Sequence, residues 1–219
     1  MRLLNKYYAD FIKYLGEENK EEAFRCAMQI LKETGVVKLY EEILAPGLNS
    51  VIDEFGADSK ELIWREHVRS GIIKTIVENS YSFVLDEREK IGIKHNENII
   101  VLCPKFEEHE IGARMAADFF TIAGFKTTHI GANTPEDTLS LAVEKLQPKY
   151  ISISVTNYYN LIEAKRAIDK LRQKDNYSGK IILGGHAFSS DPQVYKRIGG
   201  DYLLSNFNEI LKFSKEVNL

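Results

Sequence analysis

Three short stretches in the second half of this chain combine residue types that can do chemistry. They are Glu107-x-His109-x-x-Gly112, Ser154-x-Thr156 and Gly184-Gly185. A neutral imidazole is a good ligand for borderline transition metals, and a carboxylate that accepts its second ring N–H fixes the tautomer. Each stretch also has an ordinary explanation when it is taken alone. The histidine can be an exposed loop residue or a helix cap, the hydroxyl pair can decorate a strand, and the double glycine can form a turn.

The pattern around these motifs predicts the elements that position them. Short β-rich runs such as NIIVLC at 98–103, YISISVT at 150–156 and KIILGG at 180–185 alternate with longer helical patterns. Five such strands predict an α/β domain over residues 98–219, with a doubly wound parallel sheet of Rossmann or flavodoxin type. Ligands of these sheets bind beyond the carboxyl ends of the strands. We therefore expect the three motifs to meet at one rim.

The first 87 residues have a different periodicity. Apolar residues recur there at helical spacing, as in Phe11, Tyr14 and Leu15. This pattern predicts an all-helical bundle of about four or five helices over residues 1–87. The charged, weakly periodic stretch at 87–98 is expected to be the linker between the two domains.

Composition excludes several classes of protein. A net charge of −3 provides no basic field for phosphate backbones, so direct binding of nucleic acid is not expected. The two cysteines, Cys26 and Cys103, lie far apart without a CxxC motif, which argues against a disulfide framework and for a reducing compartment. We find no apolar run of membrane-spanning length and no signal sequence in the chain, so we expect a cytoplasmic protein.

The order and spacing of the three motifs resemble the cobalamin-binding domain of methionine synthase, corrinoid methyl-carrier proteins, some mutases and light-sensing cobalamin regulators. The resemblance covers residues 98–219 and implies that His109 replaces the benzimidazole of the cofactor as the lower cobalt ligand. Glu107 is then the partner of the histidine, at a position where the family more often has aspartate. The residues implied to line a slot for the displaced nucleotide tail are Gly112, Ser154, Thr156, Gly184 and Gly185.

The helical bundle resembles the domain that covers the upper face of the corrin ring in such proteins. The stretch EFGADSKELIWREHVRSG is similar to the motif of Trp, nine residues and Glu-His in the light-sensing regulators. Glu66 and His67 match its second part, whereas Phe55 stands in place of the Trp with ten residues between, and Trp64 is out of register. The alternative for Glu66 and His67 is a solvated helix face with local charge pairs.

Three functions follow from these residues. The first is a cobalamin-binding sensor or regulator, light-responsive and acting through a DNA-binding partner; the second is the corrinoid methyl carrier of a methyltransferase system. The third is a corrin-free module of flavodoxin or response-regulator type, which is disfavoured because VLCPKF at 101–106 lacks a phosphate-accepting aspartate.

The sequence contains no residue set that could catalyse a reaction unaided. It has no Ser-His-Asp set, P-loop or dinucleotide fingerprint, so we expect the chemistry to belong to bound adenosylcobalamin or methylcobalamin rather than to an enzyme active site. A helical bundle of this kind often pairs, which makes a homo-oligomer a further expectation.

Overall fold

The chain forms two compact units, Met1–Glu87 and Arg88–Leu219. The computed structural model describes residues 2–48, 60–173 and 177–217. Phe55, one of the residues expected to bind the cofactor, lies outside the described residues.

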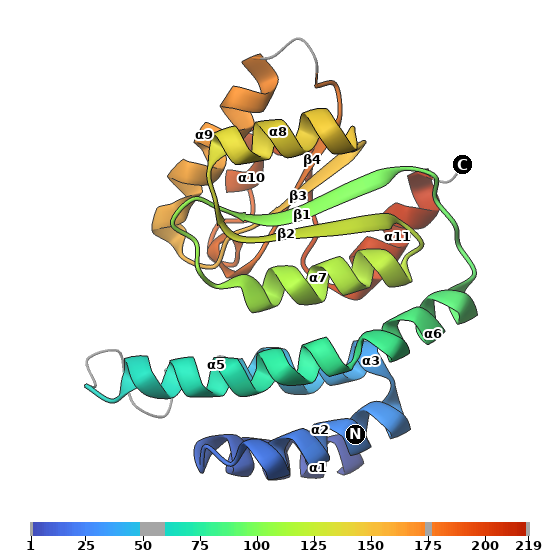
Figure 1. The fold of residues 1–219 in the computed structure, drawn as a ribbon, viewed down its shortest axis with the longest axis vertical. Coiled ribbons are helices and arrows are strands. Elements are labelled where there is room, and N and C mark those ends of the chain that lie inside the picture. The colour runs from blue at the N-terminus through green and yellow to red at the C-terminus, as the bar shows by residue number, and fades with distance from the viewer. Residues whose placement is uncertain (1, 49–59, 174–176, 218–219) are drawn as a thin grey trace. The chain divides into compact units, whose positions relative to one another are not determined.

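Every described element of the N-terminal unit is a helix, as predicted (Figure 1). The elements are α1 (Arg2–Gly16), α2 (Lys20–Thr34), the short α3 (Val36–Lys38), the π-helical η1 (Leu39–Leu44), α5 (Leu62–Asn79) and the first part of α6 (Tyr81–Ile91). Asn19 begins α2 by accepting a hydrogen bond from the Glu22 N–H at 3.2 Å. The buried core comes from successive helices and includes Phe11, Ile30, Ile43 and Ile73. None of the described helices combines the length and apolarity needed to cross a lipid bilayer.

The C-terminal unit contains a parallel five-stranded sheet with the order β2-β1-β3-β4-β5, which confirms the predicted fold class. Its strands are β1 (Asn98–Pro104), β2 (Lys126–Thr134), β3 (Tyr150–Ser154), β4 (Lys180–Gly184) and β5 (Tyr202–Leu203). This is the flavodoxin-like order, in which the direction of winding reverses between β1 and β3. The loops that follow these two strands therefore diverge and leave a crevice at the carboxyl edge of the sheet.

Helices cover both faces of the sheet (Figure 1). They are α7 (Glu110–Ile122) and α11 (Phe207–Val217) on one face, and α8 (Glu136–Leu146), α9 (Leu161–Gln173) and α10 (Val194–Arg197) on the other. Alternate residues of β1 supply the two faces, since Ile100 and Leu102 belong to the aliphatic cluster formed with α8, α9 and α10. Aromatic rings dominate the opposite face, where Phe125 packs near Tyr150 and Phe213.

The segment expected to be a linker is more ordered than its composition predicts. Helix α6 continues to Ile91, so the expected boundary falls inside a helix. His95 attaches the remainder to the C-terminal unit, because its N–H donates to the Gly124 carbonyl at 2.9 Å and its ring stacks on Phe125 at 4.0 Å. The His95 Nε2 also lies 2.8 Å from Ser214 Oγ of α11. The contacts of one buried histidine thus fasten this loop to the C-terminal unit.

Protonation of His95 is expected to destabilise the C-terminal unit. Burial lowers the pKa of His95 below its ordinary value of 6.5. The negative charge of Glu97 raises this pKa, and the positive charge of Lys149 lowers it further, so the net shift is downward. The unfolded chain therefore binds this proton more readily, and the stability that His95 contributes is complete above pH 6.5 and declines as the pH falls below that value. Calorimetry from about pH 7.5 to about pH 5.5 should show a steeper fall in melting temperature for the wild type than for H95Q, which retains a hydrogen-bonding side chain without titrating. Equal slopes would contradict this role.

Candidate functional site

A single buried carboxylate joins the loops that follow β1 and β3. Glu107 is fully buried, and its Oε1 accepts hydrogen bonds from the His109 backbone N–H at 3.2 Å and from His109 Nδ1 at 2.5 Å. Its Oε2 accepts from the backbone N–H groups of Thr156 at 3.0 Å and Asn157 at 2.8 Å. The side-chain amide of Asn160 donates to the same oxygen at 3.1 Å. The carboxylate therefore bridges the crevice where the winding of the sheet reverses.

Hydrogen bonding keeps Glu107 ionised despite its burial. Burial alone would raise its pKa, but the hydrogen bonds from His109, Asn157 and Asn160 outweigh that effect and lower the pKa from 4.5 to about 2. The group is consequently an anion throughout the physiological pH range. In this state both carboxylate oxygens of Glu107 act only as hydrogen-bond acceptors.

His109 is oriented by this anion. The contact of 2.5 Å between Nδ1 and an ionised carboxylate places the ring proton on Nδ1, because two acceptors would repel each other at that distance. The lone pair of the neutral ring then lies on Nε2, and the side chain is 51% exposed. His109 occupies the N-cap position of α7, but its side chain makes no capping hydrogen bond, so the helix-cap explanation is wrong. This arrangement is typical of an imidazole held ready for a metal.

The other motif residues lie at the same carboxyl edge of the sheet. Ser154 is the last residue of β3 and pairs in register with Gly184 at the end of β4. A Cβ on Gly184 would lie 2.7 Å from the Leu204 carbonyl oxygen. Gly185 has a φ of +102°, and a Cβ there would lie 2.4 Å from the Val155 carbonyl oxygen. The chain's own backbone therefore requires both glycines, which is a reason the sequence does not reveal.

Gly112 differs from the glycine pair. It lies in the first turn of α7, and a Cβ there would meet no atom within 4 Å beyond its chain neighbours and the backbone of its own helix. The open space beside this turn is what a bound group would need for a close approach to the helix.

The donor set suits a metal that arrives inside a larger ligand. Bare metal ions in proteins commonly take about three or four protein ligands. In the described part of the chain, no group of three or more His, Cys, Asp or Glu side chains is arranged to hold one. The rim instead offers one imidazole supported by one carboxylate, together with open space at Gly112. These features fit a metal whose other positions are filled by a macrocycle.

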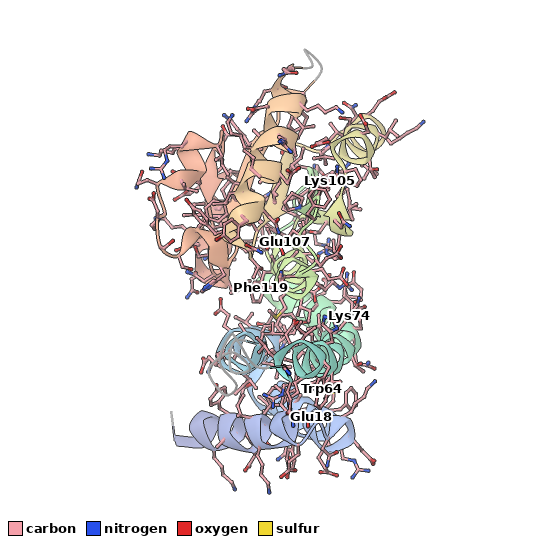
Figure 2. All side chains as sticks on the ribbon, turned by 90° about the vertical axis from the view of Figure 1, so that its left-hand side faces the viewer. Glu18, Trp64, Lys74, Lys105, Glu107 and Phe119 are labelled. Atoms are coloured by element: carbon pink, nitrogen blue, oxygen red, sulfur yellow. The ribbon has the colours of Figure 1, made fainter. Side chains whose placement is uncertain are left out.

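The remaining expected residues belong to the helical unit. Glu66 and His67 lie on α5, 3.8 Å apart, and Glu66 accepts a hydrogen bond from Ser70 Oγ at 3.2 Å. The His67 side chain is 73% exposed. Trp64, which Figure 2 labels, lies three residues before His67 on the same helix. Its exposed fraction is 47%. A role for Glu66 and His67 at the cofactor stays a prediction.

Sequence reasoning missed Asn157 and Asn160. Both follow the Ser-x-Thr motif in the stretch NYYN, and both contribute N–H groups to Glu107. Asparagine is common in turns, so two asparagines directly after a strand were a usable signal for a structured loop. Their acceptor, however, lies about fifty positions earlier in the chain.

Comparison with known proteins identifies the family. The model of the B12 binding domain matches residues 97–206, half of the chain. The chain belongs to this family. Its matched region contains the Glu107–His109 pair and all the rim residues described above.

Two curated relatives have different roles. The HTH-type transcriptional repressor CarH of Myxococcus xanthus is 24% identical over 170 residues, which cover 78% of this chain and 54% of that protein. The chain thus spans about half the length of this relative. The trimethylamine corrinoid protein of Methanosarcina barkeri is 25% identical over 207 residues, which cover 91% of this chain and 88% of that protein.

Solved structures share the fold. The monomethylamine corrinoid protein of Methanosarcina barkeri superposes with a TM-score of 0.81 at 17% identity, over 97% of this chain and 99% of that chain. A cobalamin-binding protein from Desulfitobacterium hafniense has a TM-score of 0.51 at 14% identity, over 94% and 96% of the two chains. At these identities the similarity concerns the fold alone.

Removing the charge of Glu107 is expected to destabilise the protein even when no cofactor is bound. In E107Q the amide NH2 faces backbone N–H groups that it cannot satisfy, so the free energy of unfolding at neutral pH should fall by about 1–3 kcal/mol. The difference from wild type should narrow as the pH falls from 4.5 toward about 2, because the contribution of an ionised Glu107 is lost in that range. Urea unfolding measures both effects, with E144Q on the exposed surface of α8 as the control. Equal stability of E107Q and E144Q would contradict the bridging role.

Proposed function

We propose that the α/β unit binds a cobalamin with Nε2 of His109 as the lower axial ligand, in place of the cofactor's own benzimidazole. The observation that carries this proposal is the contact of 2.5 Å between His109 Nδ1 and the buried Glu107 in a chain of the B12-binding family. The carboxylate fixes the tautomer and increases the basicity of the coordinating nitrogen. Bound cobalt would supply the reaction chemistry, as cofactors generally do.

The rim residues have separate tasks in this proposal. Gly112 leaves space at the first turn of α7, and Ser154 with Thr156 offers hydroxyl groups at the end of β3. Gly184 and Gly185 keep the loop after β4 close to the sheet, because they have no side chain and their backbone packs against Leu204 and Val155. Together these residues would admit the displaced nucleotide tail.

For the whole chain we propose the role of a corrinoid methyl carrier working with methyltransferase partners. Its support is the similarity to the trimethylamine corrinoid protein along 91% of this chain and 88% of that protein, which includes the helical unit as well as the α/β unit. In this role the protein presents the cofactor, and the partners add and remove the methyl group.

The second candidate is the cobalamin-dependent sensor. The similarity to CarH over 78% of this chain and the Glu66–His67 pair on α5 favour it. In this role Glu66 and His67 would act near the upper ligand, and a change in the packing or assembly of the helical unit would be read by a DNA-binding partner.

Light and upper-ligand preference are expected to separate the two roles. A methyl carrier should bind methylcobalamin and keep its oligomeric state after green light, since its output is a transferred methyl group. A sensor should bind adenosylcobalamin and change its size on illumination, since its output is a change in assembly. Visible spectra and size-exclusion chromatography in the dark and after illumination measure both properties. A light-dependent change of assembly would overturn the carrier proposal in favour of the sensor.

Loss of His109 is expected to abolish the lower ligation. In H109A the bound cobalamin should lose the spectrum of histidine ligation, and its affinity should fall by about tenfold or more. Visible absorption titration with methylcobalamin and hydroxocobalamin gives both the spectrum and the dissociation constant. K145A is the control, because it removes an exposed side chain from the last turn of α8 in the same unit. A wild-type spectrum and affinity in H109A would refute the assignment.

A further inference from the structure

An aromatic side chain beside Glu107 has an unusual backbone conformation. Phe106 has a φ of +66°, in the left-handed region that bulky L-residues rarely adopt. Its side chain is nevertheless 60% exposed. A protein that keeps a large apolar ring in solvent on an unfavourable backbone has not placed it there for its own core.

Two asparagine side chains hold Phe106 in this conformation. Its backbone N–H donates to Asn133 Oδ1 at 2.8 Å, and its carbonyl accepts from Asn160 Nδ2 at 3.2 Å. Asn133 is itself held, because its N–H donates to the Glu107 carbonyl at 2.9 Å and its side-chain amide donates to Glu108 Oε1 at 2.8 Å. The end of β2 and the loop that follows β3 therefore both hold the backbone of Phe106.

One of the two asparagines that hold the Phe106 backbone also donates to Glu107, the carboxylate that orients His109. Asn160 donates both to the Phe106 carbonyl and to Glu107 Oε2. Lys105 and Glu107, which flank Phe106 in the chain, mark this loop in Figure 2. Further exposed side chains follow β3, namely Tyr158 and Tyr159 in the loop that Glu107 binds and Ile162 in the first turn of α9. The backbone of Phe106 is thus held by hydrogen bonds that share Asn160 with the support of His109.

We propose that Phe106 is a contact residue for the corrin macrocycle, and that the loop accepts an unfavourable backbone in the free protein to present it. This inference rests on the proposed function. A macrocycle centred on a metal bound by His109 extends over the side chains that flank the imidazole. Phe106 is separated from His109 by two residues, and it offers an exposed apolar surface in the same loop. Binding would then bury an aromatic face that the free protein leaves in water.

Two substitutions separate backbone conformation from side-chain contact. F106A removes the ring but keeps a Cβ, whereas F106G also relieves the left-handed φ. The apo F106G protein should melt about 2–4 °C above apo F106A, the reverse of the usual order for these residues. Both variants should bind hydroxocobalamin about tenfold or more weakly than wild type in visible absorption titration. L141A, from an exposed side chain of α8 that is 64% exposed, should bind like wild type.

The outcomes distinguish this inference from the proposed function. If H109A binds cobalamin with the wild-type spectrum, the proposed function itself fails. If wild type shows ligation that depends on His109 while F106A and F106G bind as tightly as L141A, only the role of Phe106 is refuted, and a surface for a partner protein becomes its explanation. An apo F106G protein that melts below F106A would refute the claim that the backbone is held in an unfavourable state.

Discussion

The site depends on one buried anion. A carboxylate removed from water is costly unless each lone pair meets a donor, and Glu107 meets this condition with N–H groups from His109, Thr156, Asn157 and Asn160. These donors come from loops after two different strands, so the loops must close around the carboxylate before its burial becomes tolerable. The orientation of the His109 ring follows from this closure, as does the ionised state that holds the proton on Nδ1.

Sheet topology explains why this closure occurs at one place. In the order β2-β1-β3-β4-β5 the loops after β1 and β3 start on adjacent strands and leave toward opposite faces. Glu107 crosses the resulting crevice. Next to it, Gly184 and Gly185 allow the loop after β4 to pack against the Leu204 and Val155 carbonyls, where a side chain would collide. The rim is therefore built on strand ends whose loops are held by close packing and hydrogen bonds, as a site that positions a metal ligand requires.

The two sides of the α/β unit use polar contacts differently. On the rim, hydrogen bonds to Glu107 support the exposed His109 ring. Hydrogen bonds to the Phe106 backbone hold that residue, whose side chain is also exposed, at a positive φ. At His95, by contrast, hydrogen bonds and ring stacking fasten a polar segment into the aromatic layer between the sheet and α11. The first arrangement is typical of a ligand-binding surface, and the second is typical of contacts that stabilise the fold.

The sequence by itself determined the fold class and the rim. Period-2 and period-3.6 patterns depend on neighbouring residues, so they predicted the helical half, the five-stranded parallel sheet and the edge at which His109, Ser154 and Gly184 lie. The family motif added the pairing of Glu107 with His109. Tertiary structure alone decided that Asn157 and Asn160 complete the carboxylate's shell, that the double glycine is required by Val155 and Leu204, and that α6 extends into the first part of the expected linker, to Ile91. The physical reason is that each of these features depends on contacts between segments far apart in the chain, which local patterns do not encode.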